Sequence, residues 1–483
     1  MHGIIFASGE CYSLIVFKRK EASLMYGIVK ICITENRYPA LYEYCADMTS
    51  RYKNLKNASL FILRQWYTAY GRSNLQPNQI EVANLVQDTC RSTGKKKPGR
   101  IISYNFIEKM MRLTENPDYY AHLPRHCAQH AIKEAVNDFR SWKAALEAYF
   151  RDPSKFTGKP KMPKYIKRNV TTLTSSNQEC VIKEIDDSYY LKLPLTKEMI
   201  QVHIPDDARL MEVKIKPFYG NYVIVLTYQS DTVINSPSSF QPVYEGAIDL
   251  GVNNLAALVG NDGNEPLLYK GEVLKSRNQW YNKQKAMHIS CLTKGHDPKT
   301  VCKDSKLLRR LSRYRADFIR DYLHKVSSHI VKICLKRNIG ILYIGKNDQW
   351  KTKANMSKAS NQEFVSIPHS TLIWMIRYKA ERYGISVIEQ EESYTSKASF
   401  LDDDVLPVYG ENDEEQKFSG RRISRGLYRT KNGTILNADI NGSANILRKA
   451  SPNAFEGITD YRFLQKVKTV PFRALFPAGT VSV

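Results

Sequence analysis

The sequence predicts a multidomain α+β protein whose second half is an α/β domain, and three observations support this fold class. Apolar residues recur every three to five positions over residues 39–70 and again over 124–150, which is the period of amphipathic helices. Residues 180–228 consist of short β-branched runs separated by turn residues, which is typical of strands. Strand and helix patterns then alternate from residue 243 onward, as they do in α/β domains.

The chain is long and strongly basic. It has 483 residues, of which 72 are Lys or Arg and 48 are Asp or Glu, and this gives a formal net charge of +24. At about 150 residues per domain, the length allows roughly three domains. A hydrophobic content of 42% makes wholesale disorder unexpected. The positive surplus indicates a polyanionic partner, above all nucleic acid, although a merely soluble basic protein is the alternative.

Cysteine usage and hydropathy indicate the compartment. No two of the nine cysteines form a C-x-x-C pair, which fits buried thiols in a reducing compartment better than a disulfide framework or a zinc knuckle. No apolar run reaches the roughly 18 residues that a membrane span needs. The apolar stretch near the start has no basic segment ahead of it. We therefore expect a cytoplasmic protein, in the prokaryotic cytosol or nucleoid, with no membrane partner.

Changes in composition divide the chain into segments. A Ser/Pro-rich stretch at residues 235–242 is predicted to be the main linker, because it separates strand patterns with turn-forming residues. The predicted segments are an N-terminal part with a first strand (1–35), a helical lobe (36–154), a β-rich remainder (155–234), the linker (235–242), an α/β core (243–398), a polar insert (399–434) and a C-terminal part (435–483).

Basic clusters recur in four places and are candidate nucleic-acid contacts. Residues 155–168 contain prolines that forbid a long helix, and their lysines with Phe156 and Tyr165 suit a nucleic-acid backbone. Along the predicted helix 305–337 the arginines fall largely off the apolar stripe, so a solvated face of a core helix is the alternative there. The candidate contacts are Lys95, Lys96, Lys97, Arg100, Lys159, Lys161, Lys164, Lys167, Arg168, Arg309, Arg310, Arg313, Arg421, Arg422 and Arg425.

Two aspartates are candidate metal ligands. Asp249 lies inside the otherwise apolar run 247–252, and an ionised carboxylate on a central strand is costly to bury unless it is paired or bound to a cation. Capping of a nearby turn is the alternative to metal ligation. Asp439 precedes a predicted helix, where a lone aspartate more often caps the helix N-terminus.

The segments that hold these aspartates resemble a known family when they are taken together. Residues 248–256 (IDLGVNNLA) and 439–447 (DINGSANIL) resemble the first and third motifs of the RuvC-type RNase H core of the TnpB/OrfB proteins of bacterial insertion sequences. Residues 342–351 (LYIGKNDQWK) fall where the second motif lies. YTSK, at 394–397, resembles the segment before the usual zinc ribbon. These proteins are related to type V CRISPR effectors and to the eukaryotic Fanzor proteins.

The resemblance covers most of the chain and implies a fold and an activity. It implies an RNase H-like (RuvC) nuclease domain preceded by a wedge β-barrel with an inserted helical recognition lobe, and makes residues 399–434 a target-nucleic-acid-binding insert. It also implies a Mg²⁺-dependent, RNA-guided DNA endonuclease that binds a transposon-derived guide RNA. Such an enzyme cuts double-stranded target DNA beside a short adjacent motif, and we expect a monomer.

The first departure from the family pattern concerns a glutamate. The common pattern has this residue in the second motif, where this chain has Gly345. Asp249 and Asp439 alone would leave a two-metal site short of oxygen ligands. Some TnpB relatives and the Fanzor proteins carry a replacement glutamate just before the YTSK-like segment. The resemblance therefore implies Glu392 as the third catalytic residue and ligand of two Mg²⁺ ions, with Glu391 in reserve; a solvated strand end is the alternative.

The second departure concerns the zinc ribbon. The family usually has two C-x-x-C pairs here, and alignment on their flanks puts Ser399 and Asp402 at the first pair and Arg429 and Asn432 at the second. Cys334 is the last cysteine of the chain, so a four-thiolate zinc site is excluded and no structural zinc is expected.

Two other functions remain open at this level. One is a nuclease-inactive, RNA-guided DNA-binding repressor, which Gly345 favours and the two retained aspartates oppose. The other is a DNA transposase, which would share the fold.

Overall fold

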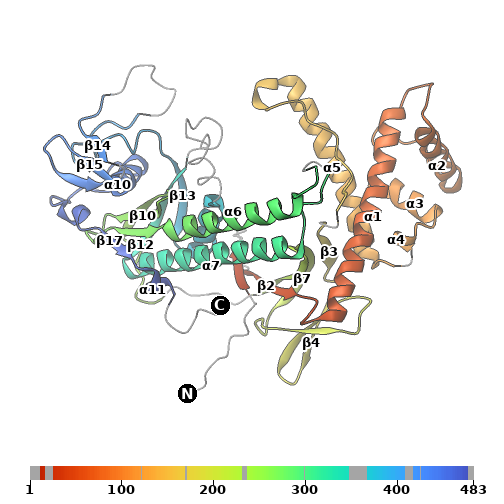
Figure 1. The fold of residues 1–483 in the computed structure, drawn as a ribbon, viewed down its shortest axis with the longest axis horizontal. Coiled ribbons are helices and arrows are strands. Elements are labelled where there is room, and N and C mark those ends of the chain that lie inside the picture. Colours follow the sequence, from red (N-terminus) through yellow and green to blue (C-terminus); the bar gives the residue numbers. More distant parts are fainter. Residues whose placement is uncertain are drawn as a thin grey trace. The chain divides into compact units, whose positions relative to one another are not determined.

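The computed structural model shows two compact units, one comprising most of the chain up to Thr232 and the other running from Val233 onward (Figure 1). Among the residues described, no helix is long and apolar enough to cross a membrane. The structure describes residues 11–16, 25–120, 122–168, 171–230, 237–297, 300–346, 367–407, 417–424 and 426–476.

The helices of the first unit lie in sequence between its strands β2 and β3. The long helix α1 packs against α2 and α5, and its Tyr67 makes edge-to-face contacts with Phe139 and Trp142 of α5 at ring-centroid distances of 5.4 and 5.3 Å. Such aromatic contacts add to the apolar burial that holds the two helices together. The helices are α1 (Pro39–Ala69), α2 (Pro77–Thr93), α3 (Tyr104–Leu113), α4 (Pro117–Tyr120) and α5 (Arg125–Arg151).

The strands of the first unit form two sheets. The larger has the order β1-β2-β8-β7-β3, and the smaller is an antiparallel sheet, β4-β5-β6. Strand β2, which precedes the helices, pairs antiparallel with β8, which follows them, so the helical segment is an insertion into the larger sheet. The strands are β1 (Cys11–Val16), β2 (Met25–Ile33), β3 (Leu173–Ser176), β4 (Val181–Ile185), β5 (Ser188–Lys192), β6 (Met199–Val202), β7 (Arg209–Phe218) and β8 (Asn221–Ser230).

The second unit is built on a six-stranded mixed sheet with the order β13-β12-β9-β10-β11-β17. Strands β9, β10 and β11 form an antiparallel meander, whereas β12 runs parallel to β9, and β13 runs parallel to β12. The carboxyl ends of β9, β12 and β13 therefore meet at one edge of the sheet. The strands are β9 (Tyr244–Asp249), β10 (Asn254–Gly260), β11 (Leu267–Lys270), β12 (Ile339–Lys346), β13 (Ser386–Glu391) and β17 (Lys468–Val470).

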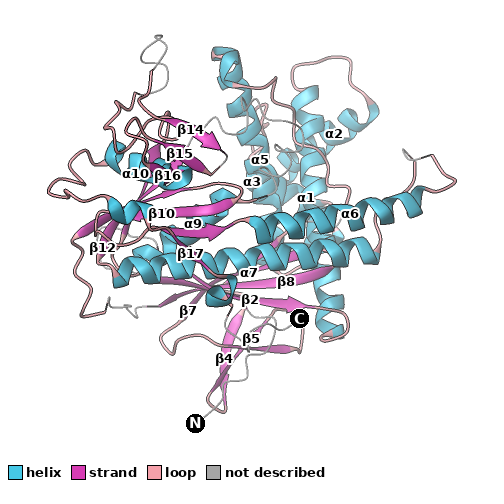
Figure 2. Cartoon of the chain, turned by 60° about the vertical axis from the view of Figure 1, so that its left-hand side comes forward, coloured by secondary structure: helices cyan, strands magenta, loops and turns pink. Residues whose placement is uncertain are grey.

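Helices cover both faces of this sheet, which explains why β9 and β10 read as continuous apolar runs rather than alternating ones. Side chains alternate along β9, so Ile248 joins the core with α7 and α9, while Ala247 packs with α10 on the other face. Asp249 has the same parity as Ala247. Helices α6 and α7 lie side by side (Figures 1 and 2). The helices are α6 (Glu272–Thr293), α7 (Lys306–Lys336), α9 (His369–Glu381), α10 (Ala438–Ala450) and α11 (Phe472–Leu475).

The polar insert contains a small antiparallel sheet, β14 (Arg421–Ser424), β15 (Leu427–Arg429) and β16 (Ile435–Asn437). The sequence did not indicate these strands, because β14 is exposed along its whole length and shows no apolar alternation. The sheet also crosses the end of the insert predicted at residue 434, since β16 leads directly into α10.

The cysteines only partly follow the expectation of buried thiols. Cys45, Cys127, Cys180 and Cys334 are buried, whereas Cys291 and Cys302 are exposed near the ends of α6 and α7. The expectation of buried thiols was wrong for Cys291 and Cys302.

Candidate active site

Asp249 is the last residue of β9, at the edge where the parallel strands end. It pairs with Ala257 of β10, and its neighbour Ile248 pairs with Ile344 of β12. The side chain is partly buried and lies toward α10, where a Cβ at Gly442 would come within 2.7 Å of its Oδ2. The glycine in α10 thus leaves room for the carboxylate of Asp249 between sheet and helix.

Asp439 enters the same region from the first turn of α10. Asn437 caps this helix, since its side chain accepts hydrogen bonds from the backbone N–H groups of Asp439 (3.0 Å) and Ile440 (3.3 Å). The capping role that was the alternative for Asp439 therefore belongs to Asn437. The carboxylate of Asp439 accepts a hydrogen bond from Asn254 Nδ2 (2.6 Å) and pairs with Arg422 Nη2 (3.3 Å).

Glu392 follows the last residue of β13 and completes a cluster of three carboxylates. Burial raises the pKa of Asp249 well above its usual range, and the negative charges of Glu392 and Asp439 raise it further. Arg422 opposes this increase because its positive charge favours the ionised form. A buried aspartate whose ionisation is disfavoured by two nearby carboxylates forms a site that a cation would stabilise.

The two neighbouring glutamates are held by cations instead. Glu389 accepts hydrogen bonds from Lys346 and from Arg377 (2.6 Å), which lower its pKa. Burial works to raise the pKa of Glu391, but hydrogen bonds from Lys449 (2.6 Å) and Ser393 (2.7 Å) outweigh it, and the net shift is downward. Between Glu391 and Glu392, the structure thus brings Glu392 to the two aspartates.

Gly345 explains how a glutamate from β13 can reach this position. A Cβ at Gly345 would lie 2.5 Å from Glu392 Oε2 and 2.6 Å from Ile446 Cδ1. Such distances are shorter than van der Waals contact, so the carboxylate of Glu392 takes up space that a side chain at position 345 would need. A side chain at position 345 of β12 would therefore occupy the same space as the side chain of Glu392, which follows β13.

Asn254 is a site residue that sequence reasoning missed. Asn254 begins β10, and its side chain contacts Asp439. Its amide oxygen Oδ1 is buried and accepts no hydrogen bond from the described residues. A polar residue at the start of an otherwise apolar strand was a signal that the sequence offered.

The donors of this site fit a hard divalent cation. Carboxylate and amide oxygens are ligands that Mg²⁺ accepts, and a buried oxygen without a donor suits a cation or its bound water. Within the described residues, no three His, Cys, Asp or Glu side chains already stand in the close arrangement of a metal cage. In the present arrangement Asp439 is engaged by Asn254 and Arg422.

The predicted basic contacts of the first unit are exposed and are supported by α1. Lys97 lies over the ring of Trp66 (5.5 Å) and Arg100 over that of Tyr67 (4.2 Å). Residues 155–168 carry six basic and no acidic side chains and form no α-helix. Three residues in this unit anchor the backbone of residues 160–166: Asn57 and Arg64 of α1, and Trp142 of α5. The exposed lysines and arginines are Lys95, Lys96, Lys97, Arg100, Lys159, Lys161, Lys164, Lys167 and Arg168.

The predicted basic contacts of the second unit differ among themselves. Arg309 and Arg310 are exposed on α7, where Arg309 pairs with Asp304 (2.8 Å), and Arg313 is partly buried. Arg421 and Arg422 are exposed on β14, but only Arg422 is seen to reach the carboxylate cluster. Arg425 lies outside the described residues.

Sequence comparison gives matches in the second unit. Residues 233–351 match a family model described as a probable transposase of the OrfB, IS605 type, and residues 369–446 match one described as a Cas12f1-like TNB domain. The chain is 28% identical over 209 residues to the TnpB-like protein ORF457 of Acidianus two-tailed virus. That match spans 42% of this chain and 41% of the viral protein, less than half of either.

Similar solved structures include a Cas12f1–sgRNA–target DNA complex, with a TM-score of 0.47 and 14% identity over 85% of this chain and 84% of that one. Another is the mini-RNA-guided endonuclease CRISPR-Cas_phi3, with a TM-score of 0.37 and 9% identity over 92% of each chain.

These sequence matches make the second unit, with its mixed α/β fold and carboxylate cluster, similar to transposase-related proteins. More particularly, the second unit is similar to the TnpB/OrfB proteins.

Proposed function

We propose that this protein is an RNA-guided DNA endonuclease that hydrolyses DNA phosphodiesters with Mg²⁺. The observation that carries the proposal is the convergence of Asp249, Glu392 and Asp439, in which burial and the two neighbouring carboxylates raise the pKa of Asp249. A carboxylate cluster of this kind is unfavourable without a cation.

Asp249, Glu392 and Asp439 would hold two Mg²⁺ ions, with the amide oxygen of Asn254 as a further contact for an ion or its water. Bound ions of this kind activate a water molecule and stabilise charge on the leaving oxygen. The chain itself orients the ligands: the ends of β9 and β13 fix Asp249 and Glu392, and the capped first turn of α10 fixes Asp439.

Guide RNA is proposed to bind the basic surface along α1. Lys97, Arg100 and residues 159–168 all lie near this helix, and their exposed cations alternate with the aromatic rings of Trp66, Tyr67 and Tyr165. Cations would contact phosphates, and the exposed ring of Tyr165 can stack on an unpaired base. In this proposal base pairing with the guide selects the target sequence.

The remaining assignments extend the similarity to the TnpB/OrfB proteins. The sheet β13-β12-β9-β10-β11-β17 with its helices is proposed as the RuvC-like, RNase H-like core. The sheets of the first unit are proposed as the wedge barrel and α1–α5 as the recognition lobe. We further propose a transposon-derived guide, a double-stranded DNA target with a short adjacent motif, and a monomeric protein.

A guided-cleavage assay tests the proposal. The protein is purified with its flanking transcript, the copurified RNA is sequenced, and a DNA target matched to that RNA is offered with Mg²⁺. We expect cleavage by the wild type, and binding without cleavage by Asp249→Ala and Asp439→Ala. Purification free of RNA, or cleavage by Asp249→Ala at the wild-type rate, would contradict the proposal.

The second candidate is a nuclease-inactive, RNA-guided DNA-binding protein. Gly345 and the engagement of Asp439 by Arg422 favour it. Guided binding by the wild type without cleavage, at every Mg²⁺ concentration, would select this function instead.

A further inference from the structure

The insert of the second unit lacks the chemistry of a zinc ribbon. The positions that align with the ribbon's four cysteines hold Ser399, Asp402, Arg429 and Asn432. Of these side chains only that of Asp402 is an anionic donor, and the guanidinium of Arg429 is a cation that has no free pair for a metal. A zinc ion with four ligands therefore does not fit these residues. Any bond that joins the first half of the insert, with Ser399 and Asp402, to the second half, with Arg429 and Asn432, must come from groups other than zinc.

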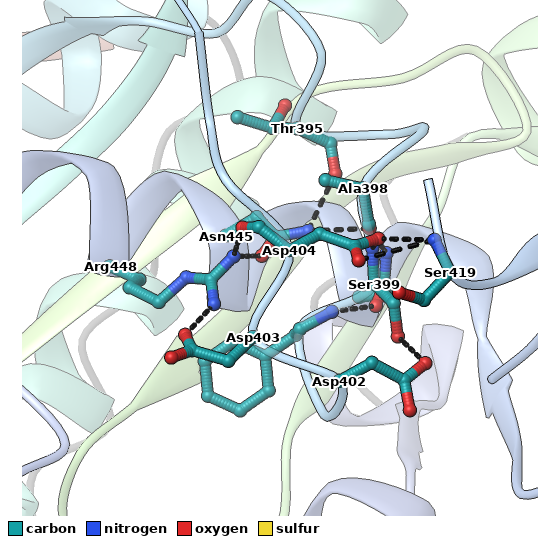
Figure 3. Close-up of polar contacts among 11 residues, drawn as sticks. Thr395, Ala398, Ser399, Asp402, Asp403, Asp404, Ser419, Asn445 and Arg448 are labelled. Carbon is teal, nitrogen blue, oxygen red and sulfur yellow. Dashed lines mark hydrogen bonds and ion pairs between the residues drawn. The ribbon is translucent and has the colours of Figure 1, made fainter. Parts of the chain in front are cut away.

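The carboxylate of Asp402 makes that connection. Its Oδ2 accepts a hydrogen bond from Ser399 Oγ (2.6 Å), which belongs to the first half, and from the backbone N–H of Lys431 (2.9 Å), which belongs to the second. Ser399 is fully buried, and Figure 3 shows its side chain directed at Asp402. Lys431 lies in the tight turn between β15 and β16, where Gly433 has a φ of +82° and donates to Thr430 O. A charged acceptor thus bonds an amide across 29 residues of sequence.

Asp404 makes a second connection of the same kind. Its carboxylate accepts the backbone N–H of Ser399 (2.7 Å) and that of Ser419 (3.0 Å), which comes just before β14 (Figure 3). Hydrogen bonds from amides to an ionised carboxylate are stronger than those between neutral groups.

The intervening Asp403 points elsewhere. It pairs with Arg448 of α10 at the surface, where its side chain is 90% exposed. Arg448 remains attached without it, because its guanidinium also donates to Asp404 O (2.6 Å) and to Asn445 Oδ1 (3.0 Å). Asp403 therefore provides a matched control within the same acidic stretch.

The sheet held by these bonds reaches the carboxylate cluster. Arg422 on β14 pairs with Asp439, and β16 continues into α10, of which Asp439 is the second residue. Tyr428 on β15 adds a further tie by donating to Lys397 O (2.7 Å).

We propose that Asp402 and Asp404 form a metal-free clasp that takes over the cross-linking role of zinc in this insert and positions Arg422 at Asp439. The two aspartates are positioning residues that act through the β14–β16 sheet. The effect of Arg422 on the carboxylate site rests on the proposed function. The clasp itself is inferred from the hydrogen bonds of Asp402 and Asp404 alone.

Hydrogen–deuterium exchange on the full chain tests the clasp without guide, target or Mg²⁺. In Asp402→Ala the amide of Lys431 loses its acceptor, so its exchange should become at least about tenfold faster, as expected for a bond to an ionised group. The amides of α10 should keep their wild-type rates. Asp403→Ala should leave the Lys431 amide within about twofold of wild type, because a surface ion pair contributes little.

Asp402→Asn is the second variant, and it replaces Asp402→Ala if that protein fails to fold. It keeps an oxygen acceptor but removes the charge, so an intermediate increase in exchange at Lys431 is expected. Unchanged exchange at Lys431 in Asp402→Ala or in Asp402→Asn would overturn the proposal, as would equal acceleration throughout α10.

The metal content of the purified protein provides a second, independent test of the clasp. Elemental analysis of the purified protein should find no stoichiometric zinc, and the zinc chelator 1,10-phenanthroline should leave the melting temperature unchanged. A stoichiometric zinc ion whose removal lowers the melting temperature would overturn the clasp. Because neither measurement involves cleavage, a wild type that does not cut DNA would count against the proposed function and leave the clasp standing.

Discussion

Replacing Glu392 with Ala is the perturbation that examines the site most specifically. Glu392 is the glutamate that the structure brings to Asp249 and Asp439, whereas Glu391 is held by Lys449. Between unit charges about 4 Å apart in an effective dielectric of about 20, the interaction energy is about 4 kcal/mol. At 1.36 kcal/mol per factor of ten in rate, loss of one carboxylate from a cation clamp corresponds to roughly a 10³-fold slower cleavage step.

The assay is single-turnover cleavage of a guided target at saturating Mg²⁺, with target binding measured separately. We expect the rate of Glu392→Ala to fall about 10³-fold while binding stays near the wild-type level. Glu391→Ala is the matched control, and because its carboxylate faces Lys449, we expect a change of less than about tenfold. Wild-type rates in both variants would refute the assignment of the third ligand.

A glutamate at position 345 provides the rescue. In the wild-type background, Gly345→Ala should slow cleavage, because the added Cβ would displace the carboxylate of Glu392 and the methyl group of Ile446. In the Glu392→Ala background the carboxylate that would clash with a side chain at position 345 is absent. Gly345→Glu should therefore recover part of the lost cleavage rate. If Gly345→Glu recovers nothing while the double variant still folds and binds target, the two positions do not serve one site.

Three further outcomes are expected. Asp249→Asn should raise the melting temperature of the metal-free protein at neutral pH and reduce its stabilisation by Mg²⁺. A carboxyl whose pKa is raised in the folded state stabilises the fold only while it is protonated, and this contribution is lost as the pH rises through that pKa. The measurement compares the melting temperatures of Asp249→Asn and wild type at pH 5 and pH 8. A variant that melts no higher than wild type at pH 8 would contradict this prediction. Arg422→Ala should lower the Mg²⁺ concentration for half-maximal cleavage by up to about fivefold, since an exposed ion pair with Asp439 is worth at most about 1 kcal/mol; an increased requirement would show that Arg422 instead helps to hold the cluster. Combined replacement of Lys161, Lys164 and Lys167 with Ala should reduce the salt slope of RNA binding by about 2, at roughly 0.7 per single-strand phosphate; an unchanged slope would remove these lysines from the RNA surface.

Periodicity was sufficient for the long elements and insufficient for the site. The apolar spacing of residues 39–70 and 305–337 predicted α1 and α7 almost to the residue, because burial of one helix face leaves a repeating pattern. The strands of the insert left no such pattern, since β14 buries no side chain. Local sequence therefore showed the core elements and missed those held by polar contacts.

The candidate site was predictable only as a set of residues and not as an arrangement. The sequence indicated Asp249 and Asp439, and the family resemblance implied Glu392 with Glu391 in reserve. Adjacent residues of a strand point to opposite faces, so the choice between the two glutamates depended on a register that the sequence does not give. In the structure Glu391 pairs with Lys449, whereas Glu392 lies near Asp249. The contacts of Asn254 and Arg422 with Asp439 cross 185 and 17 residues of sequence, and no local pattern encodes them.

The most direct test of the proposed active site is to locate a divalent cation in the complex of this protein with guide RNA and target DNA. Mn²⁺ scatters anomalously and substitutes for Mg²⁺ at oxygen sites, so crystals of the complex soaked in Mn²⁺ show where the ions bind. We expect anomalous peaks coordinated by the carboxylates of Asp249, Glu392 and Asp439, and their loss in Asp249→Asn. Peaks elsewhere, or none at these three carboxylates in a complex that cleaves its target in solution, would contradict it.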